Sequence, residues 1–353
     1  MYFKETYFYN FRNIQPERHE WSVGLNLITG PNGAGKTNFL EGLNLISGWG
    51  PLEKNTRMSD LICWNSIGKG NGASLSGKVS GEADAEILAA VTTRCSLKFD
   101  GKSSNAFAVR SHMPVLSWLS SHISLLKGGA SNRRALLDKV GALVSPSYAV
   151  RLHDYRYVLR QKSALLRKSR DAAFVEKPML RIGAWLWTAR EEILRMLAES
   201  LDEFGELLPS PVSLVFKRGG AGIDENPSAD FKKAVLLNGD RERAAKIPLV
   251  GPQRDDVGIF CGAREAAVAL SRGQSKRMAS AVILASALVV ERVLGKKPVL
   301  VFDEMTSELD SDGRLSTIRA LERTGCQIFA TATDPIFSDL IEPHDIRDGR
   351  FVQ

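Results

Sequence analysis

Residues 30–37 read GPNGAGKT, and they satisfy the pattern G-x-x-x-x-G-K-[ST] without a substitution. Before them, LNLI at residues 25–28 is a short apolar run typical of a β-strand. After them, helical spacing relates the apolar residues Phe39, Leu40, Leu43 and Ile46. A strand, a glycine-rich turn and a helix in this order predict the phosphate-binding unit of an α/β fold. We therefore expect nucleotide contacts at Gly30, Pro31, Asn32, Gly33, Ala34, Gly35, Lys36, Thr37 and Asn38.

The residue types of this phosphate loop have a chemical reason. Glycines allow successive backbone N–H groups to turn inward around phosphate oxygens. Lys36 has the length to reach the β and γ phosphates, and Thr37 offers a hydroxyl group to magnesium at the start of the helix. The alternative is an ordinary glycine turn before a helix, which would bind no nucleotide.

A second segment supplies the acidic residues that a nucleotide site needs. VLVF at residues 299–302 suits a buried parallel strand, and Asp303 and Glu304 follow it directly. We expect Asp303 to hold magnesium through water and Glu304 to polarise the attacking water as a general base. Taken alone, an acidic pair of this kind is also common at a simple strand end.

A third segment, LSRGQ at residues 270–274, permits two interpretations. Ser271 can cap the N-terminus of a helix without any ligand. The exposed N–H groups and the hydroxyl of the same helix start also suit a bound anion, so the segment can be half of a nucleotide site.

Composition limits the class of protein. The chain has 353 residues, and its 44% of hydrophobic residues is ordinary for a globular protein. The formal net charge of +7 fits a polyanionic partner such as nucleic acid, and the distribution of the charge has to decide whether there is one. Four widely spaced cysteines predict reduced thiols, and the N-terminus has no apolar signal segment. These features predict a soluble cytoplasmic protein that does not enter the membrane.

The middle of the chain differs from both ends. Short alternating runs at residues 83–107 predict antiparallel strands with a turn at Asp100 and Gly101. Helical periodicity dominates residues 131–208 and predicts a pair of long antiparallel helices inserted into the α/β domain. Strand and helix signals return from residue 246, and CQIFATAT at residues 326–333 is the expected last strand. The predicted division is residues 1–125, 126–235 and 236–353.

Three motifs in sequence order resemble those of ABC-type ATPases: the phosphate loop, the LSRGQ signature with Ser271, Gly273 and Gln274, and the acidic strand end. Residues 307–310 follow as the D-loop, which implies a nucleotide contact at Asp310. Further stretches resemble the RecF family of SMC-like ATPases; they are NFRN at 10–13, KTN at 36–38, LKG at 126–128, RR at 133–134, LD at 137–138 and LVGPQRDD at 249–256. Three positions depart from the family pattern: His122, Gln253, and Glu304, where the family usually has a second aspartate and the wider ABC class a glutamate. The γ-phosphate sensor is also open, and Thr333 is the candidate.

The resemblance implies an ABC-type ATPase head built from both ends of the chain, with an inserted helical arm, and a weak DNA-stimulated ATPase activity. It implies a homodimer in which ATP and magnesium lie between the phosphate loop of one copy and the signature of the other. It also implies binding to gapped or single-strand/double-strand junction DNA, and partnership with recombination mediators such as RecR in loading recombinase onto single strands. The alternatives are an SMC-like nuclease partner or a phage-defence ATPase.

Basic residues in the helical part are candidates for DNA contact. Residues 151–170 hold seven Lys or Arg against the single acid Asp154. On a helical wheel Arg156, Arg160, Arg167 and Arg170 gather beside the apolar stripe, where they could bind phosphates. Arg133 and Arg134 are either phosphate contacts or partners of acidic groups in the protein. The alternative for the whole set is a solvated helix face. No base-reading motif is present, so binding should be independent of sequence and sensitive to salt.

Overall fold

The computed structural model describes residues 1–52, 55–63, 72–81, 83–118, 123–222, 224–305, 309–332 and 343–352. The chain folds into two compact units. Unit 1 comprises Met1–His122 and Val290–Gln353, and unit 2 comprises Ile123–Val289. Both ends of the chain therefore contribute to unit 1. The three-part division at residues 125 and 235 stays a prediction.

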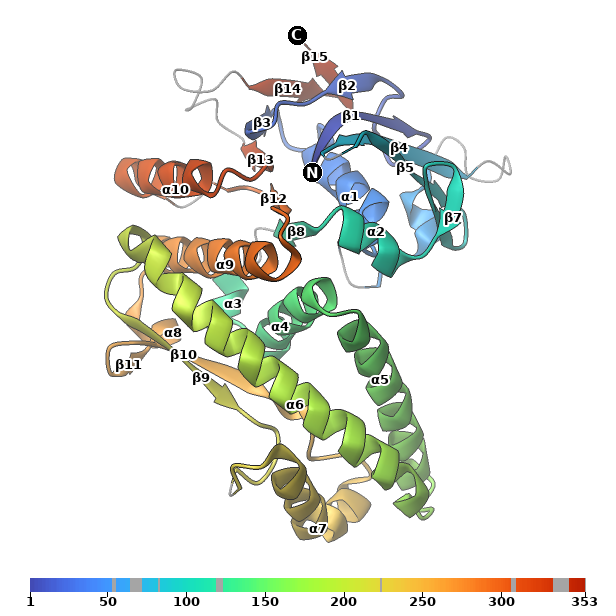
Figure 1. Cartoon of the computed structure of the whole chain (residues 1–353), viewed down its shortest axis with the longest axis vertical. Helices are drawn as coiled ribbons and strands as arrows, with labels where there is room; N and C mark the ends of the chain where they lie inside the picture. Colours follow the sequence, from blue (N-terminus) through green and yellow to red (C-terminus); the bar gives the residue numbers. More distant parts are fainter. Residues whose placement is uncertain are drawn as a thin grey trace. The chain divides into compact units, whose positions relative to one another are not determined.

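Unit 1 holds two sheets (Figure 1). Its first part contains β1 (Tyr2–Tyr9), β2 (Arg18–Glu20), β3 (Leu25–Thr29), α1 (Lys36–Ile46), the 3₁₀ turn η1 (Met58–Leu61), β4 (Ala73–Ser80), β5 (Ala85–Val91), β6 (Cys95–Phe99), β7 (Lys102–Ser104), α2 (Ala106–His112) and β8 (Val115–Trp118). Its second part contains β12 (Val299–Phe302), α10 (Ser311–Thr324), β13 (Ile328–Ala332), β14 (His344–Arg347) and β15 (Arg350–Val352).

The sheet that matters for function has the order β15-β14-β3-β13-β12-β8. Its strands run parallel except for β15, which pairs with β14 in the antiparallel sense. The apolar runs at 25–28 and 299–302 thus form the parallel strands that the sequence predicts. Residues 326–333 do not contain the last strand, because β14 and β15 follow β13 in the chain and add to the same sheet.

The second sheet of unit 1 is antiparallel, with the order β2-β1-β4-β5-β6-β7. The predicted turn at Asp100 and Gly101 joins β6 to β7, and both residues have positive φ, at 47° and 72°. This conformation fits a two-residue hairpin turn. The antiparallel strands predicted for residues 83–107 are therefore confirmed up to β7, but residues 106–107 belong to helix α2, which Asn105 caps through the backbone N–H of Ala108.

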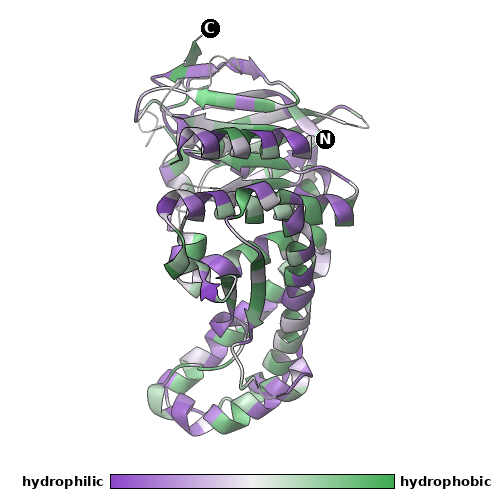
Figure 2. Ribbon diagram, turned by 90° about the vertical axis from the view of Figure 1, so that its left-hand side faces the viewer, coloured by the Kyte–Doolittle hydropathy of each residue, from purple (hydrophilic) through white to green (hydrophobic). Residues whose placement is uncertain are grey.

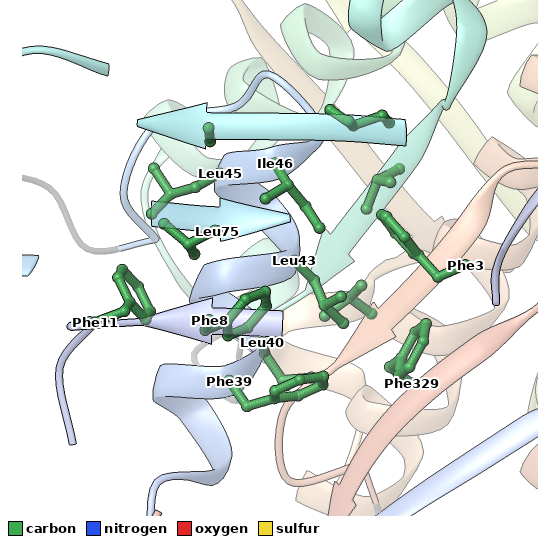
Figure 3. Close-up of a cluster of buried hydrophobic side chains, with 14 of the residues drawn as sticks. Phe3, Phe8, Phe11, Phe39, Leu40, Leu43, Leu45, Ile46, Leu75 and Phe329 are labelled. Carbon is green, nitrogen blue, oxygen red and sulfur yellow. The ribbon is translucent and has the colours of Figure 1, made fainter. Parts of the chain in front are cut away.

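A shared core joins α1 to both sheets. Figure 3 shows Phe8 and Phe39 face to face among buried Leu and Phe side chains, and their ring centroids are 5.3 Å apart. Gly42 of α1 permits this approach, because a Cβ atom there would lie 2.3 Å from the ring of Phe8. The helix that follows the phosphate loop is thus fixed by close packing against β1.

Unit 2 is mainly helical. It contains α3 (Ile123–Lys127), α4 (Ala130–Val144), α5 (Pro146–Arg167), α6 (Ala173–Leu201), η4 (Asp202–Leu207), β9 (Val212–Lys217), α7 (Pro227–Ala245), η5 (Pro252–Arg254), β10 (Asp256–Cys261), β11 (Arg264–Glu265) and α8 (Ala266–Ala269), and α9 (Arg272–Leu294) begins in it. The long helices α5 and α6 pack together, as the sequence predicts. Figure 2 shows hydrophilic and hydrophobic residues mixed along the long helices. The small sheet β11-β10-β9 was not expected. Among the described residues no helix has both the length and the apolar character needed to cross a membrane.

Candidate active site

Three neighbouring parallel strands of unit 1 end at the predicted site residues. The phosphate loop follows β3, Asp303 and Glu304 follow β12, and β13 lies between these two strands and carries Thr331 near its end. Because the carboxyl ends of parallel strands meet at one edge of a sheet, that edge is where an α/β protein binds its ligand. Residues more than 260 positions apart in the chain meet there through side-chain hydrogen bonds.

The phosphate loop has the backbone that its glycines allow. Gly30, Gly33 and Gly35 have φ values of 145°, 82° and 115°. A Cβ atom at Gly30 would lie 2.2 Å from the carbonyl oxygen of Ile346, so this position also requires glycine for space. Helix α1 begins at Lys36, and Gly35, its N-cap residue, has no side chain to cap the first turn. Backbone N–H groups at such a helix start are donors for phosphate oxygens.

Lys36 lies folded against the loop and is 7% exposed. Its Nζ donates hydrogen bonds to the carbonyl oxygens of Gly30 and Pro31, at 2.6 and 3.0 Å. Burial lowers the pKa of Lys36, whereas the nearby carboxylates of Asp303, Glu304 and Asp345 act in the opposite direction. The ammonium group is therefore a partly desolvated cation at the centre of the loop, where phosphate oxygens would stabilise it.

Asp303 joins the phosphate loop to the neighbouring strands. Thr37 donates its hydroxyl hydrogen to Oδ2 of Asp303 at 3.0 Å, and Thr331 donates to Oδ1 at 2.6 Å. The predicted magnesium pair, Thr37 and Asp303, is thus assembled. Hydroxyl and carboxylate oxygens are ligands that Mg²⁺ prefers, and this ion usually completes its shell with water and phosphate oxygens. The donor set fits magnesium.

Thr331 was not predicted from the sequence. Besides its bond to Asp303, its Oγ1 accepts the backbone N–H of Glu304 at 2.8 Å, so one hydroxyl group fixes both acidic residues. The signal for it in the sequence is a polar residue near the end of an otherwise apolar strand. The candidate sensor Thr333, the D-loop residues Ser307 and Glu308, and His122 lie outside the described residues.

Glu304 has an unusual backbone conformation, with φ at 48°. Positive φ is uncommon for residues other than glycine and costs about 1 kcal/mol or more, so surrounding contacts must maintain it. The hydrogen bond from its N–H to Thr331 is one such contact. A positive φ and this hydrogen bond thus hold Glu304 in a turn directly after β12.

Asn38 supports the loop in this structure. Its Nδ2 donates to Oδ1 of Asn13 at 2.8 Å, and Asn13 donates in turn to the carbonyl oxygen of Gly33 at 3.2 Å. Next to them, Arg12 forms an ion pair with Glu41 at 2.9 Å. The NFRN stretch near the N-terminus thus lies against the phosphate loop and α1. A nucleotide contact of Asn38 itself stays a prediction.

Two histidines lie beside this end of the sheet. Strand β14 places Asp345 opposite Thr29. The preceding residue, His344, contacts His19, and Nδ1 of His344 lies 2.9 Å from Nε2 of His19. Burial and His344 lower the pKa of His19 to about 4, although Glu17 acts in the opposite direction. His19 is therefore neutral in the folded protein at pH 7.

This pKa predicts a loss of stability in mild acid. The unfolded chain takes up a proton at His19 as the pH falls below its usual value near 6.5, whereas the folded chain resists protonation until about pH 4. The contribution of His19 to the free energy of unfolding is thus fully present above pH 6.5 and is lost as the pH falls toward 4. The free energy of unfolding should fall between pH 7 and pH 5. We expect His19→Gln to make this fall smaller by about 1 kcal/mol, after allowance for partial exposure. Denaturant titration at both pH values measures it. His153→Gln, at a side chain that is 77% exposed, is the control, and an equal change in both variants would contradict a role for the burial of His19.

The signature segment forms a helix start in unit 2. The backbone N–H of Gln274 donates to Oγ of Ser271 at 3.2 Å, and the N–H of Ser271 donates to Oε1 of Gln274 at 3.0 Å. This reciprocal arrangement is a capping box, so Ser271 does cap α9. Ser271 is exposed and Gly273 is half-buried, which leaves this helix start accessible to a ligand. In unit 1, Asp310 caps α10 through a hydrogen bond from the N–H of Gly313, at 2.8 Å.

The six candidate arginines are not equivalent. Arg133 forms a bidentate ion pair with Asp256, at 2.6 and 3.0 Å, and also donates to two backbone carbonyls. These contacts favour the interpretation of Arg133 as a partner of internal acids. Arg160 and Arg167 are exposed on α5, and Arg156 is exposed beside Asp138. Helix α5 ends at Arg167, so the helical wheel does not extend to Arg170.

A buried ionic network underlies the GPQRDD segment of unit 2. Arg190 forms ion pairs with Asp255 at 2.5 Å and with Asp138 at 2.8 Å, and it is 2% exposed. Burial raises the pKa of Asp255 to about 6, while Arg190 and the N–H groups of Gly219 and Trp187 oppose the shift. Asp255 is therefore ionised at pH 7. Gln253 accepts a hydrogen bond from Tyr155 and donates to the carbonyl of Val250, so it is integrated into the same region.

Comparison with known proteins gives consistent results. Residues 2–342 match the RecF/RecN/SMC N terminal domain family. The chain is 31% identical over 335 residues to the DNA replication and repair protein RecF of Rhizobium rhizogenes, with 90% of this chain and 88% of the relative covered. It is 28% identical to the RecF of Mesorhizobium japonicum, over 94% of this chain and 92% of that protein.

Solved structures agree. The recombination mediator protein RecF of the RecFOR pathway, in its ATPrS form, superimposes with a TM-score of 0.88 at 25% identity, with 99% of this chain and 97% of that chain covered. An Smc head bound to the C-winged helix domain of ScpA superimposes with a TM-score of 0.56 at 16% identity, with 99% and 96% covered, and this likeness concerns the fold.

Proposed function

Because the chain belongs to the RecF family of DNA replication and repair proteins, which are ABC-type ATPases, we propose that ATP closes two copies of it around DNA and that hydrolysis separates them. Closure would act on gapped or junction DNA and would help mediator partners such as RecR to load recombinase onto single strands. Slow, DNA-stimulated hydrolysis would set how long the closed state lasts. This family membership favours a replication and repair role over an SMC-like nuclease partner or a phage-defence ATPase.

The hydrogen bonds that join Thr37, Asp303 and Thr331 carry the nucleotide part of the proposal. They bring a phosphate loop, an acidic strand end and a supporting hydroxyl group to one edge of a parallel sheet. Lys36 and the N–H groups of the loop would bind the phosphates, and Thr37 with Asp303 would hold magnesium. The metal would neutralise charge on the phosphate oxygens. Glu304 would accept a proton from the attacking water.

The capped start of α9 carries the dimer part. Ser271 is exposed at a helix start, where N–H groups and a hydroxyl group suit a γ-phosphate. In the proposed dimer, this start would close over the phosphate loop of the second copy. Nucleotide can favour closure only to the extent that it binds the closed state more tightly.

Light scattering during size-exclusion chromatography tests the whole proposal. With ATP and gapped duplex the chain should elute as a dimer on DNA, and with ADP it should elute as a monomer. A chain that stays monomeric with ATP and DNA at every concentration would exclude the closing dimer. An ATPase rate that is the same with and without DNA would exclude stimulation.

Two substitutions at Ser271 separate capping from phosphate binding. Aspartate and asparagine both cap helices well, so α9 should remain intact in each variant. We expect Ser271→Asp to lose ATP-dependent dimerisation and turnover at least tenfold, because its carboxylate would face a phosphate, while ATP binding by the single chain is retained. Ser271→Asn is the neutral control and should dimerise more strongly than Ser271→Asp. Analytical ultracentrifugation and filter binding measure both; equal dimerisation of the two variants would argue against phosphate at this position.

A further inference from the structure

A small hollow in unit 2 combines a cavity with a concentration of positive charge. Its volume is about 150 Å³, and helices α4, α5 and α6 together with η5 line it. The polar lining residues are Arg134, Asp138, Tyr155, Arg156, Arg190 and Gln253. Three arginines thus line a space large enough for one phosphate group.

The charges in this hollow do not balance. Arg190 is matched by the fully buried Asp255, with 2.5 Å between the charged atoms. Asp138 is shared, because Arg190 and Arg156 both form ion pairs with it, at 2.8 and 3.2 Å. Two carboxylates therefore face three arginines, and one positive charge remains.

Arg134 carries the excess charge. Within the described residues its hydrogen bond goes to a backbone carbonyl, that of Asp255 at 2.6 Å, and no carboxylate lies within ion-pair distance. Burial lowers the pKa of Arg134, and the like charge of Arg190 adds to this effect, while the more distant carboxylates of Asp255, Asp138 and Asp256 oppose it without reversing it. A half-buried guanidinium without a carboxylate partner is costly, and an anion would relieve that cost.

The carboxylate of Asp138 does not engage all the N–H donors of the arginines around it, so donors remain for such an anion. Both oxygens of Asp138 are already engaged, Oδ1 by Tyr148 and Arg190 and Oδ2 by Arg156. Arg156 remains 59% exposed at the mouth of the hollow. Arginine offers five N–H donors in a planar fork that matches phosphate oxygens.

We infer that this hollow, which Arg134 and Arg156 share, binds one backbone phosphate of DNA. The inference rests on the proposed DNA-binding function and specifies where one contact of that function lies. Arg190 acts as a positioning residue, because its ion pairs hold Asp138 and Asp255 and so fix the hollow around the other two arginines. Arg133, one position before Arg134, is excluded from this role by its bidentate pair with Asp256.

Salt dependence of DNA binding tests the inference. Each phosphate contact contributes about 0.9 to the slope of log K against log salt concentration. Since both arginines share one phosphate, the arginine left in Arg134→Gln or in Arg156→Gln still contacts it, so each single variant should weaken binding with little change in the slope. The double variant should reduce the slope by about 1, with roughly tenfold weaker binding of gapped duplex. A double variant whose slope falls by about 2 would mean separate phosphates and would overturn a shared site. Fluorescence anisotropy measures the slopes.

The control removes the same charge elsewhere in unit 2. Arg195 and Arg243 are exposed and pair with neighbouring acids on their own helices. The double variant Arg195→Gln/Arg243→Gln should keep the slope of the unmodified chain. If it loses as much as Arg134→Gln/Arg156→Gln, general charge explains the effect and the hollow is not a site.

A second measurement separates this inference from the proposed function. Inorganic phosphate should protect Arg134 and Arg156, but not Arg195 or Arg243, from phenylglyoxal, as read by peptide mass spectrometry. If phosphate protects these two arginines in a chain that fails to bind DNA, the phosphate site is supported and the DNA-binding function is rejected. DNA binding without protection by phosphate or by DNA would reject the site and retain the function.

Discussion

Glu304→Gln should bind ATP with unchanged affinity and hydrolyse it about 100- to 10,000-fold more slowly, because the amide cannot accept a proton from water. The change preserves the size of the side chain, and the backbone bond from residue 304 to Thr331 does not depend on the carboxylate. If hydrolysis separates the two copies, the variant should accumulate as a dimer with ATP. Phosphate release under single-turnover conditions and sedimentation velocity measure the two effects.

An exposed glutamate provides the control for this variant. Glu322 lies on α10, and Glu322→Gln should retain full turnover. A Glu304→Gln chain that hydrolyses ATP normally would exclude Glu304 as the general base. A chain that is inactive yet always monomeric would keep the general base and exclude hydrolysis as the step that opens a dimer.

Lys36→Met should lose nucleotide binding, with turnover at least 100-fold lower. The variant removes the ammonium group that contacts the carbonyl oxygens of Gly30 and Pro31, and it leaves the nearby carboxylates facing a highly charged ligand. Loss of a single preorganised donor to developing charge commonly reduces turnover by about 100- to 1,000-fold. Methionine has a similar length, so the packing of α1 should be preserved.

Calorimetric titration with ATP measures the affinity of this variant, and Lys98→Met on the exposed face of β6 is the control. Far-ultraviolet circular dichroism checks that both variants fold. Tight ATP binding by folded Lys36→Met would move the phosphate site away from the loop. ATP-dependent dimerisation of Lys36→Met would likewise contradict phosphate binding by the loop.

Local patterns predicted the parts of unit 1 that have strong local signals. The phosphate loop, the apolar strands beside it and the turn at Asp100 depend on neighbouring residues, so short windows of sequence contain the information. Strands β14 and β15 were missed because HDIR and RFV are short and rich in charge. The Asp348-Gly349 turn between them was the available signal, since this dipeptide favours a tight hairpin.

Long-range pairs could not be predicted in the same way. Arg133 and Arg134 are adjacent in the chain, yet Asp256, 123 positions away from Arg133, engages the first, and the second faces the hollow. Spacing along a helix cannot indicate which of two neighbouring arginines an acid from a distant segment will neutralise. Thr331 is a similar case, because its importance comes from the strand order that places β13 between β3 and β12.

The capping box at Ser271 and Gln274 has a kinetic consequence for assembly. Both partners of the box belong to one chain, so this helix start is already ordered before a second copy arrives. Little conformational entropy is then lost there on association, and no slow folding step needs to precede contact. The bound nucleotide would therefore change the lifetime of a dimer strongly, and it would change the rate at which two chains associate only a little.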